Sequence, residues 1–174
     1  MNFMNDYKLS IRLASIEEAP VVLNLWKGSA EWLQTINIDQ WKPEEFNIEH
    51  VLKFMNDGSN VYVATIENEI VGTYLITWQD PFIWKELDNS ESGYIHKLAV
   101  NRNFKGKGIG LELLRSAEEQ IRSKGKRYVR LDCMADNTRL NQYYRDAGFI
   151  FVRRLDLEDW SANLYEKTLG VLVL

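Results

Sequence analysis

Three glycines alternate within five positions, at 106, 108 and 110, in the stretch NRNFKGKGIG that covers residues 101–110. The apolar run YIHKLAV precedes this stretch, and the amphipathic run LELLRSAEEQIRSKG follows it. The first amides of a helix have no intrahelical partner, and the helix dipole adds partial positive charge there. Glycine leaves such amides open to an anion and permits positive φ. With Lys105 and Lys107 at its rim, the stretch predicts a cradle for a pyrophosphate group.

Three known kinds of phosphate-binding loop have related glycine patterns. The P-loop requires Gly-x-x-x-x-Gly-Lys-[Ser/Thr], a spacing that the sequence lacks. The dinucleotide pattern Gly-x-Gly-x-x-Gly would start at Gly106, but position 111 is leucine and only Asp132 is available as the acidic residue that should follow. The acyl-CoA loop, Arg/Gln-x-x-Gly-x-Gly/Ala, fits residues 105–110 best. A surface turn rich in glycine and lysine is the simplest alternative, which the strand before and the helix after disfavour.

Hydrophobic periodicity and end signals predict the elements that hold this turn. Strands are expected at 7–14, 94–100, 127–133, 149–157 and 162–169, with a hairpin over 60–78. Helices are expected at 15–35, 44–58, 108–125 and 137–148, the first with a possible break near Gly28, and residues 79–93 are expected to form a long loop. The resulting order, β-α-α-β-β-β-α-β-α-β-β, predicts an α/β (α+β) fold with a mixed sheet and helices packed on it.

Length and composition narrow the class of protein. A chain of 174 residues with 45% hydrophobic residues suits one domain over 1–174, with residues 1–6 as a flexible tail. The net charge of −4 gives no sign of nucleic-acid binding, and no apolar run is long enough to span a membrane. The single cysteine, Cys133, excludes an intrachain disulfide and favours a reducing compartment. Since the N-terminus also lacks the apolar segment of a signal peptide, we expect a cytoplasmic protein.

The segment 94–149, with the motifs YIHKLAV, KGKGIG, LDCMADN and YYRDAGF, resembles the GNAT superfamily of acyl-CoA N-acyltransferases. The element order agrees with that family over nearly the whole chain. The resemblance implies the GNAT fold, with a mixed central sheet of about seven strands and a splayed central strand pair. It also implies transfer of an acetyl group from acetyl-CoA to a primary amine of a small molecule or peptide, by direct attack in a ternary complex. Lys105 departs from the family's Arg or Gln, with little expected effect because the loop acts mostly through backbone amides.

The resemblance also assigns residues to the cofactor. The backbone of Leu98, Ala99 and Val100 would pair with the pantetheine arm, and an amide near Leu98 would polarise the thioester carbonyl. Asn137 would contact the pantetheine arm or the acyl region, although an asparagine here also suits a helix N-cap. The pyrophosphate would lie on Lys105, Gly106, Lys107, Gly108, Ile109, Gly110 and Leu111.

Three residues are candidates for proton transfer. Tyr144, seven residues after Asn137, matches the family tyrosine that protonates the departing thiolate; the alternative is a core aromatic residue. His96 and Asp132 are candidates for the base that takes a proton from the ammonium of the acceptor, either directly or through water. The alternative is a chain of water molecules that removes the proton without any single base. As alternatives, His96 would be hydrogen-bonded within the sheet and Asp132 would pair with Arg130 or a loop amide. Cys133 is predicted to be a small buried hydrophobic residue.

The acceptor side is expected where the chain is rich in aromatic residues. Trp32, Gln40, Trp41 and Trp84 are the candidate substrate-binding residues, with helix packing as the alternative. Glu31, Asp39 and Asp80 would attract an amine or simply be solvated. Two other functions compete with catalysis: a non-catalytic acyl-CoA-binding module and a dinucleotide-binding domain. A homodimer is possible, with the C-terminal GVLVL as one candidate interface.

Overall fold

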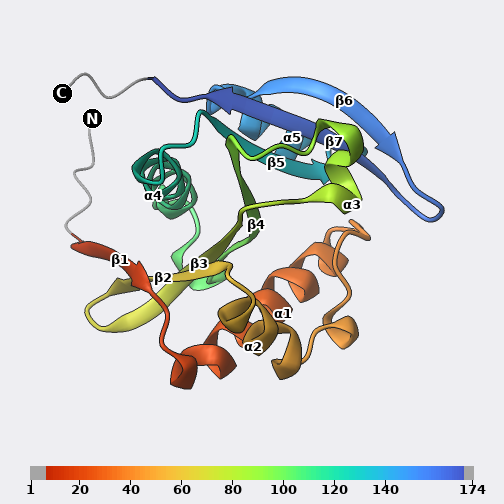
Figure 1. Ribbon diagram of the computed structural model, residues 1–174. Coiled ribbons are helices and arrows are strands. Elements are labelled where there is room, and N and C mark those ends of the chain that lie inside the picture. Colours follow the sequence, from red (N-terminus) through yellow and green to blue (C-terminus); the bar gives the residue numbers. More distant parts are fainter. Residues whose placement is uncertain (1–6, 171–174) are drawn as a thin grey trace, which may run out of the picture. The chain divides into compact units, whose positions relative to one another are not determined.

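The computed structural model describes residues 7–170 (Figure 1). The predicted tail at 1–6 and the last four residues of GVLVL lie outside the described residues. The sheet order is β1-β2-β3-β4-β5-β7-β6, and it is mixed, because β4 and β5 are parallel whereas β1 and β2, β5 and β7, and β6 and β7 are antiparallel. The seven strands are β1 (Leu9–Leu13), β2 (Asn60–Ile66), β3 (Glu69–Thr77), β4 (Ser92–Val100), β5 (Tyr128–Met134), β6 (Ile150–Asp156) and β7 (Ser161–Thr168).

Within residues 7–170, five α-helices lie between these strands. They are α1 (Ala19–Thr35), α2 (Ile48–Asn56), α3 (Pro81–Trp84), α4 (Ile109–Ser123) and α5 (Thr138–Asp146). Short 3₁₀ turns precede or follow some of them: η1 (Ile16–Glu18), η2 (Pro43–Glu45), η3 (Lys85–Leu87) and η4 (Arg102–Phe104). The predicted mixed sheet of seven strands with flanking helices is therefore confirmed.

Two details of the predicted elements are wrong. Helix α1 continues through Gly28, because the buried face formed by residues such as Trp26 and Ala30 outweighs the roughly 1 kcal/mol by which one glycine weakens a helix. Residues 79–93 are not one long loop but contain α3 and η3. Asp80 caps α3 through its side chain, and Pro81 occupies the first turn, where its missing N–H has no cost.

The chain forms two compact units, whose boundaries fall inside β3, β4 and α4. The first contains the residues up to Leu75 together with Lys97–Ser116, and the second contains Ile76–His96 together with the residues from Ala117 onward. That residues 1–174 act as one domain stays a prediction.

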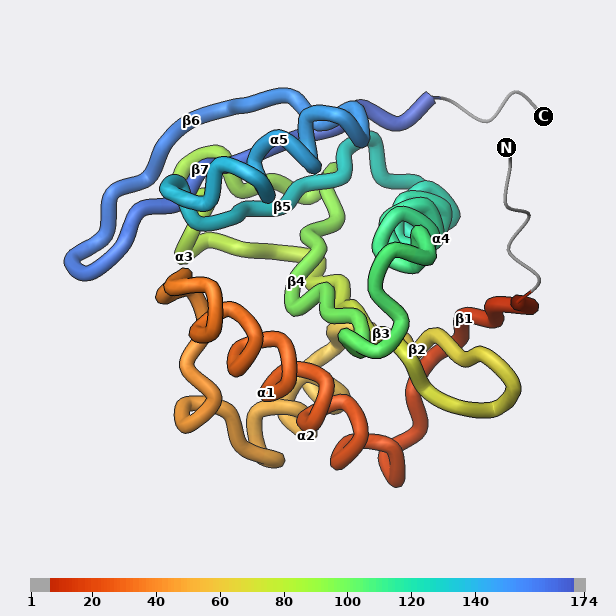
Figure 2. Tube along the Cα trace, turned by 180° about the vertical axis from the view of Figure 1, so that it is seen from behind, coloured from red at the N-terminus to blue at the C-terminus, as the bar shows by residue number. Residues whose placement is uncertain are grey.

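The core of the first unit lies where α1 and α2 meet the strands. Trp26 is 1% exposed and packs edge-on against Phe46 and Phe54, with ring centroids 5.7 and 6.2 Å apart. The hairpin between β2 and β3 turns through Glu67 and Asn68, which both have positive φ, as a two-residue turn requires. The tube in Figure 2 shows α1 and α2 lying together in this unit. This core fixes the strands from which the glycine turn departs.

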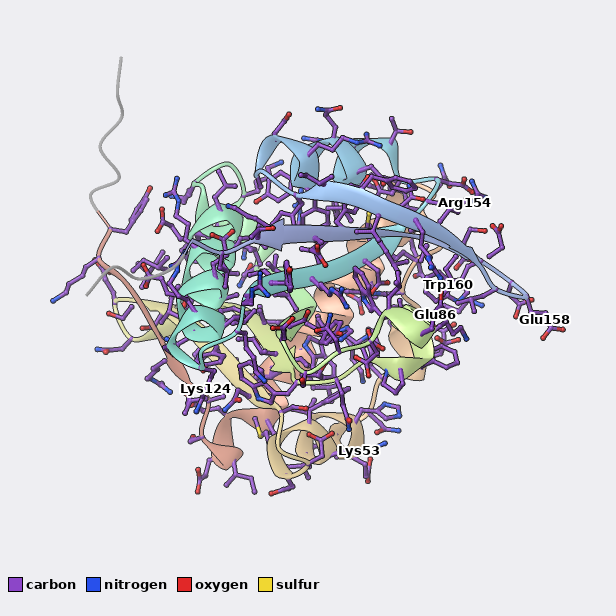
Figure 3. The ribbon with its side chains drawn as sticks, turned by 45° about the horizontal axis from the view of Figure 1, so that its top comes forward. Lys53, Glu86, Lys124, Arg154, Glu158 and Trp160 are labelled. Carbon is purple, nitrogen blue, oxygen red and sulfur yellow. The ribbon has the colours of Figure 1, made fainter. Side chains whose placement is uncertain are left out.

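In the second unit, β5 lies between β4 and β7, and α5 runs beside β5 in Figures 1 and 2. Gly93 on β4 allows a close approach, since a Cβ there would lie 2.5 Å from the side chain of Ile121 on α4. The β6–β7 hairpin carries Arg154 on β6 and Glu158 and Trp160 at its turn, as Figure 3 shows. No helix within residues 7–170 combines the length and apolar character needed to cross a membrane.

Candidate active site

The glycine turn leads from η4 into α4 in the first unit. Gly106 and Gly108 both have φ of +74, and a Cβ at either position would meet nothing within 4 Å. Both glycines therefore have the left-handed backbone that disfavours other residues, and both face open space. Gly110 lies in the first turn of the 15-residue helix α4. The turn thus presents unobstructed backbone at a helix N-terminus, the geometry that an anion site needs.

The two lysines of the turn differ. Lys105 is exposed, whereas Lys107 is half-buried and donates a hydrogen bond to the Tyr7 hydroxyl. The Lys107 ammonium also lies 4.2 Å from the centroid of the Tyr7 ring. Tyr7 and Lys107 line a pocket of about 410 Å³ together with Ile109 and Glu112. No local pattern could predict the contact between Lys107 and Tyr7, because it joins residues one hundred positions apart.

The segment predicted to pair with pantetheine begins after a backbone irregularity. Lys97 has a φ of +52, which is uncommon for a lysine and interrupts the regular strand conformation just before Leu98. Ala99 is 2% exposed and belongs to the core of the first unit, while Leu98 and Val100 are half-buried. The contacts of this backbone with pantetheine stay a prediction.

In the second unit, strand register brings His96 and Asp132 together. Tyr94 pairs with Arg130 across the parallel strands, and Nη1 of Arg130 donates to the Tyr94 hydroxyl at 3.1 Å, so both side chains lie on one face. Because side chains alternate along a strand, His96 and Asp132, two positions further on, lie on that face again. Ligand-type atoms of His96, Asp132 and Asp80 all lie within 4.8 Å of one another.

Asp80 is held in this cluster by α3. Its Oδ1 accepts a hydrogen bond from the Ile83 amide at 3.3 Å, and its side chain is only 10% exposed. Its Oδ2 lies 3.4 Å from Nε2 of His96 but makes no hydrogen bond within the described residues, so the two atoms lie side by side without donor-to-acceptor alignment. Burial raises the pKa of Asp80 to about 6, although the Ile83 amide acts in the opposite direction. The Asp-Pro pair at a helix start was the signal that could have placed Asp80 here.

Arg130 has partners other than Asp132. Its Nε donates to Glu166 at 2.8 Å, and its Nη1 donates to the Leu87 carbonyl at 2.6 Å. The guanidinium also lies 4.3 Å from the ring centroid of Trp84. The contacts of Arg130 therefore do not include Asp132, which was one predicted alternative for that aspartate.

Tyr144 lies on α5 and is 8% exposed. Its ring packs against Phe149 and Tyr165, with centroids 6.0 and 6.3 Å away. Its hydroxyl makes no hydrogen bond within residues 7–170, so its proton is not committed to another described group. Burial raises the pKa of Tyr144 well above its usual value, and Cys133 and Asp132 act in the same direction. Tyr144 is therefore protonated at neutral pH, and it lies near enough to Asp132 to sense its charge.

Cys133 is a buried residue, as predicted. It is 2% exposed, and burial raises the pKa of its thiol to about 12. A thiol with so high a pKa supplies almost no thiolate at neutral pH.

Asn137 and Asn141 organise the start of α5. Asn137 is the N-cap of α5, and its side chain accepts a hydrogen bond from the Leu140 amide at 3.1 Å. The predicted N-cap role is therefore confirmed, whereas the contact of Asn137 with the cofactor stays a prediction. Asn141 was not singled out from the sequence. Its Oδ1 accepts from the Tyr165 hydroxyl at 2.6 Å and from Nδ2 of Asn163 at 2.8 Å. These bonds fasten α5, and with it Tyr144, to β7.

The aromatic residues predicted to contact the acceptor in the first unit already contact cations of the chain. The Arg102 guanidinium lies 3.7 Å from the Trp32 ring centroid, and the Lys97 ammonium lies 5.2 Å from that of Trp41. Gln40 has a buried Oε1 without a hydrogen bond among the described residues. A substrate cation would have to displace these contacts to stack on the same ring faces, and the substrate role of these three residues stays a prediction.

For Trp84, the packing alternative is correct. Trp84 is 0% exposed and packs with Ile83, Tyr94 and Leu164 in a core cluster of the second unit. Helix α3 turns Ile83 and Trp84 inward, so burial replaces the predicted contact between Trp84 and substrate.

The candidate residues thus fall into two sets, and each set lies within one of the two units. The second unit contains His96, Asp132 and Tyr144, the three predicted proton-transfer residues, and places Asp80 beside His96 and Asp132. The first unit holds the glycine turn and the strand segment before it.

Comparison with known proteins identifies the family of the chain. Residues 26–149 match the model of the acetyltransferase (GNAT) family. The uncharacterized N-acetyltransferase YesJ from Bacillus subtilis (strain 168) is 32% identical over 148 residues, which cover 80% of each chain. The chain therefore belongs to the GNAT acetyltransferase family, and it is an acyltransferase. Acetyl-CoA is the acetyl donor in this family.

Solved structures share the fold. A GNAT-family acetyltransferase from Listeria monocytogenes 4b F2365 has a TM-score of 0.76 at 24% identity, covering 92% of this chain and 95% of its own. The ribosomal-protein-alanine N-acetyltransferase from Brucella melitensis has a TM-score of 0.72 at 22% identity, covering 92% and 99%. The protein yncA from Salmonella typhimurium, solved with its cofactor acetyl-CoA, has a TM-score of 0.71 at 13% identity, covering 96% and 97%.

Proposed function

We propose that this chain transfers an acetyl group from acetyl-CoA to a primary amine of a small molecule or a peptide. The observation that carries the proposal is the glycine turn. Gly106 and Gly108 adopt positive φ and leave space where a side chain would stand, at the N-terminus of a long helix. These features fit the diphosphate of coenzyme A, because several amides can reach its oxygens without steric hindrance.

The cofactor residues keep the roles that the family resemblance implies. The amides of residues 105–111 would hold the diphosphate, and the backbone of Leu98, Ala99 and Val100 would hold the pantetheine arm, with Asn137 beside it. Acetyl-CoA supplies an acyl thioester, which is activated toward attack by an amine. An amide near Leu98 would stabilise the negative charge that develops on the carbonyl oxygen.

His96 and Asp132 are the proposed groups that accept the proton of the acceptor ammonium, directly or through water. An ammonium must lose a proton before its nitrogen can attack, and these side chains lie within one cluster on the same face of the sheet. Asp80 adds a second carboxylate beside His96, since its Oδ2 lies 3.4 Å from Nε2.

Tyr144 is the proposed acid, which gives its proton to the departing sulfur. Its raised pKa keeps the hydroxyl protonated at neutral pH. A thiolate in the same dry surroundings would also gain proton affinity, which keeps the transfer from becoming steeply unfavourable. Direct attack by the amine is favoured over an acyl-enzyme, because the buried Cys133 thiol has a pKa of about 12.

The proposal predicts that the chain releases free thiol from acetyl-CoA only when a suitable amine is present. The amine panel should combine small primary amines with a peptide that begins with alanine, since one structural neighbour carries that acceptor in its name. Amine-dependent thiol release with an acetylated product in the mass spectrum is the expected result. Tight binding of coenzyme A without release for any amine would instead favour the non-catalytic acyl-CoA-binding module.

A thermal-shift comparison distinguishes an acetyl-CoA-binding protein from a dinucleotide-binding domain. Acetyl-CoA should raise the melting temperature and NAD should not, because only a ligand of the native state stabilises by mass action. The cytoplasmic location and the homodimer stay predictions.

A further inference from the structure

Asp80, His96 and Asp132 form a cluster of potential metal ligands within the second unit. An imidazole and two carboxylates each place one ligand-type atom within 4.8 Å of the others. Asp80 is 8% exposed, and its Oδ2 is buried without a hydrogen bond among the described residues. A buried carboxylate oxygen without a donor is costly, so it favours a cation beside it.

The geometry points to a divalent transition-metal ion, and we propose that Asp80, His96 and Asp132 form a three-ligand site for Zn²⁺. Nε2 of His96 and Oδ2 of Asp80 lie 3.4 Å apart and are not aligned as donor and acceptor. Two ligands bound tetrahedrally to zinc at 2.0–2.2 Å are separated by roughly 3.4 Å. The two atoms therefore already have the spacing of ligands that share one ion.

The chemistry of the donors selects the class of ion. Imidazole nitrogen suits zinc, copper, iron and nickel, whereas magnesium and calcium prefer sites built from oxygen alone. Three protein ligands leave a tetrahedral ion with one further position for water or another small ligand. An ammonium is a poorer occupant, because acceptors around its tetrahedral N–H groups would be about 4.7 Å apart, more than the spacing of His96 and Asp80.

Metal binding would regulate the reaction. Zn²⁺ would occupy the nitrogen and carboxylate oxygens that the proposed function assigns to proton acceptance from the amine. The ion would then act as a reversible inhibitor, and this consequence rests on the proposed function. The binding itself does not.

The test uses the full-length chain after treatment with a chelator. Isothermal titration with Zn²⁺ is expected to show one ion per chain, and Co²⁺ should give the visible absorption of a site with imidazole and carboxylate ligands. His96→Gln and Asp132→Asn should each weaken Zn²⁺ binding by roughly 100-fold, the upper end of the loss produced even by outer-shell changes. Excess Mg²⁺ should not compete.

The chain has only two histidines, so His50→Gln is a matched control. His50 is exposed on α2, and its variant should bind Zn²⁺ like the parent. Circular dichroism checks that each variant is folded. Because His96→Gln and Asp132→Asn each remove one proposed ligand, a similar loss of Zn²⁺ affinity in both is the expected result. Equal affinity of the parent and His96→Gln, or no saturable binding by the parent, would overturn the proposal. Saturable binding with no acetyl transfer to any amine would leave the metal site standing and remove the proposed function.

Discussion

Replacing Tyr144 with phenylalanine is expected to lower kcat for acetyl transfer by roughly 100-fold, the usual contribution of a positioned general acid. The substitution removes one hydroxyl and leaves the ring, which packs against Phe149 and Tyr165. That hydroxyl makes no hydrogen bond within the described residues, so its loss should leave the fold intact. Steady-state kinetics with acetyl-CoA and a saturating amine measure the effect.

The neighbouring tyrosine supplies the matched control. Tyr143 lies on the same helix, its ring centroid is 5.7 Å from that of Tyr144, and burial also raises its pKa. Tyr143→Phe should keep turnover within a few-fold of the parent and leave coenzyme A affinity unchanged. Tyr144→Phe should weaken coenzyme A binding by no more than roughly ten-fold, the contribution of about one hydrogen bond to the sulfur. If Tyr144→Phe turned over at the parental rate, Tyr144 would not be the acid.

Replacing Gly108 with valine is expected to weaken coenzyme A binding by about 10–100-fold. A hydrogen bond to a charged group contributes about 1.5–3 kcal/mol, and each 1.4 kcal/mol is a tenfold change in affinity. The added side chain would enter space that is open at a φ of +74, and it would disfavour this backbone conformation as well. Isothermal titration with coenzyme A measures the loss.

A valine at Gly125 is the control that distinguishes a loss of ligand contacts from the effect of backbone strain alone. It also has a φ of +74 with nothing within 4 Å of a Cβ, but it follows the C-terminal end of α4. Gly125→Val should lose a similar amount of stability while keeping the parental affinity for coenzyme A. An affinity of Gly108→Val equal to that of Gly125→Val would mean that the glycine turn does not hold the cofactor.

Much of the fold followed from local patterns in the sequence. The apolar run at residues 94–100, the glycines after it and the apolar spacing of residues 113–121 predict β4, the turn and α4, because each pattern acts over one element. Asn137 as an N-cap and Cys133 as a buried residue followed in the same way. Gly28 was misjudged since helix continuity there depends on packing against α2 and the strands, which no local pattern records.

The site was harder to predict because its contacts join distant segments. His96 and Asp132 could be named individually, but their proximity depends on the register that pairs Tyr94 with Arg130. Asp80 enters this cluster through a four-residue helix that the sequence suggested only by an Asp-Pro pair. Trp84 was assigned to a substrate pocket for lack of any sign that α3 would turn it into the core.

A crystal structure of the chain with coenzyme A tests the central claim most directly. The diphosphate should accept hydrogen bonds from backbone amides of residues 105–111, and the sulfur should lie within hydrogen-bonding distance of the Tyr144 hydroxyl. A diphosphate bound away from this turn, or a sulfur out of reach of Tyr144, would contradict it.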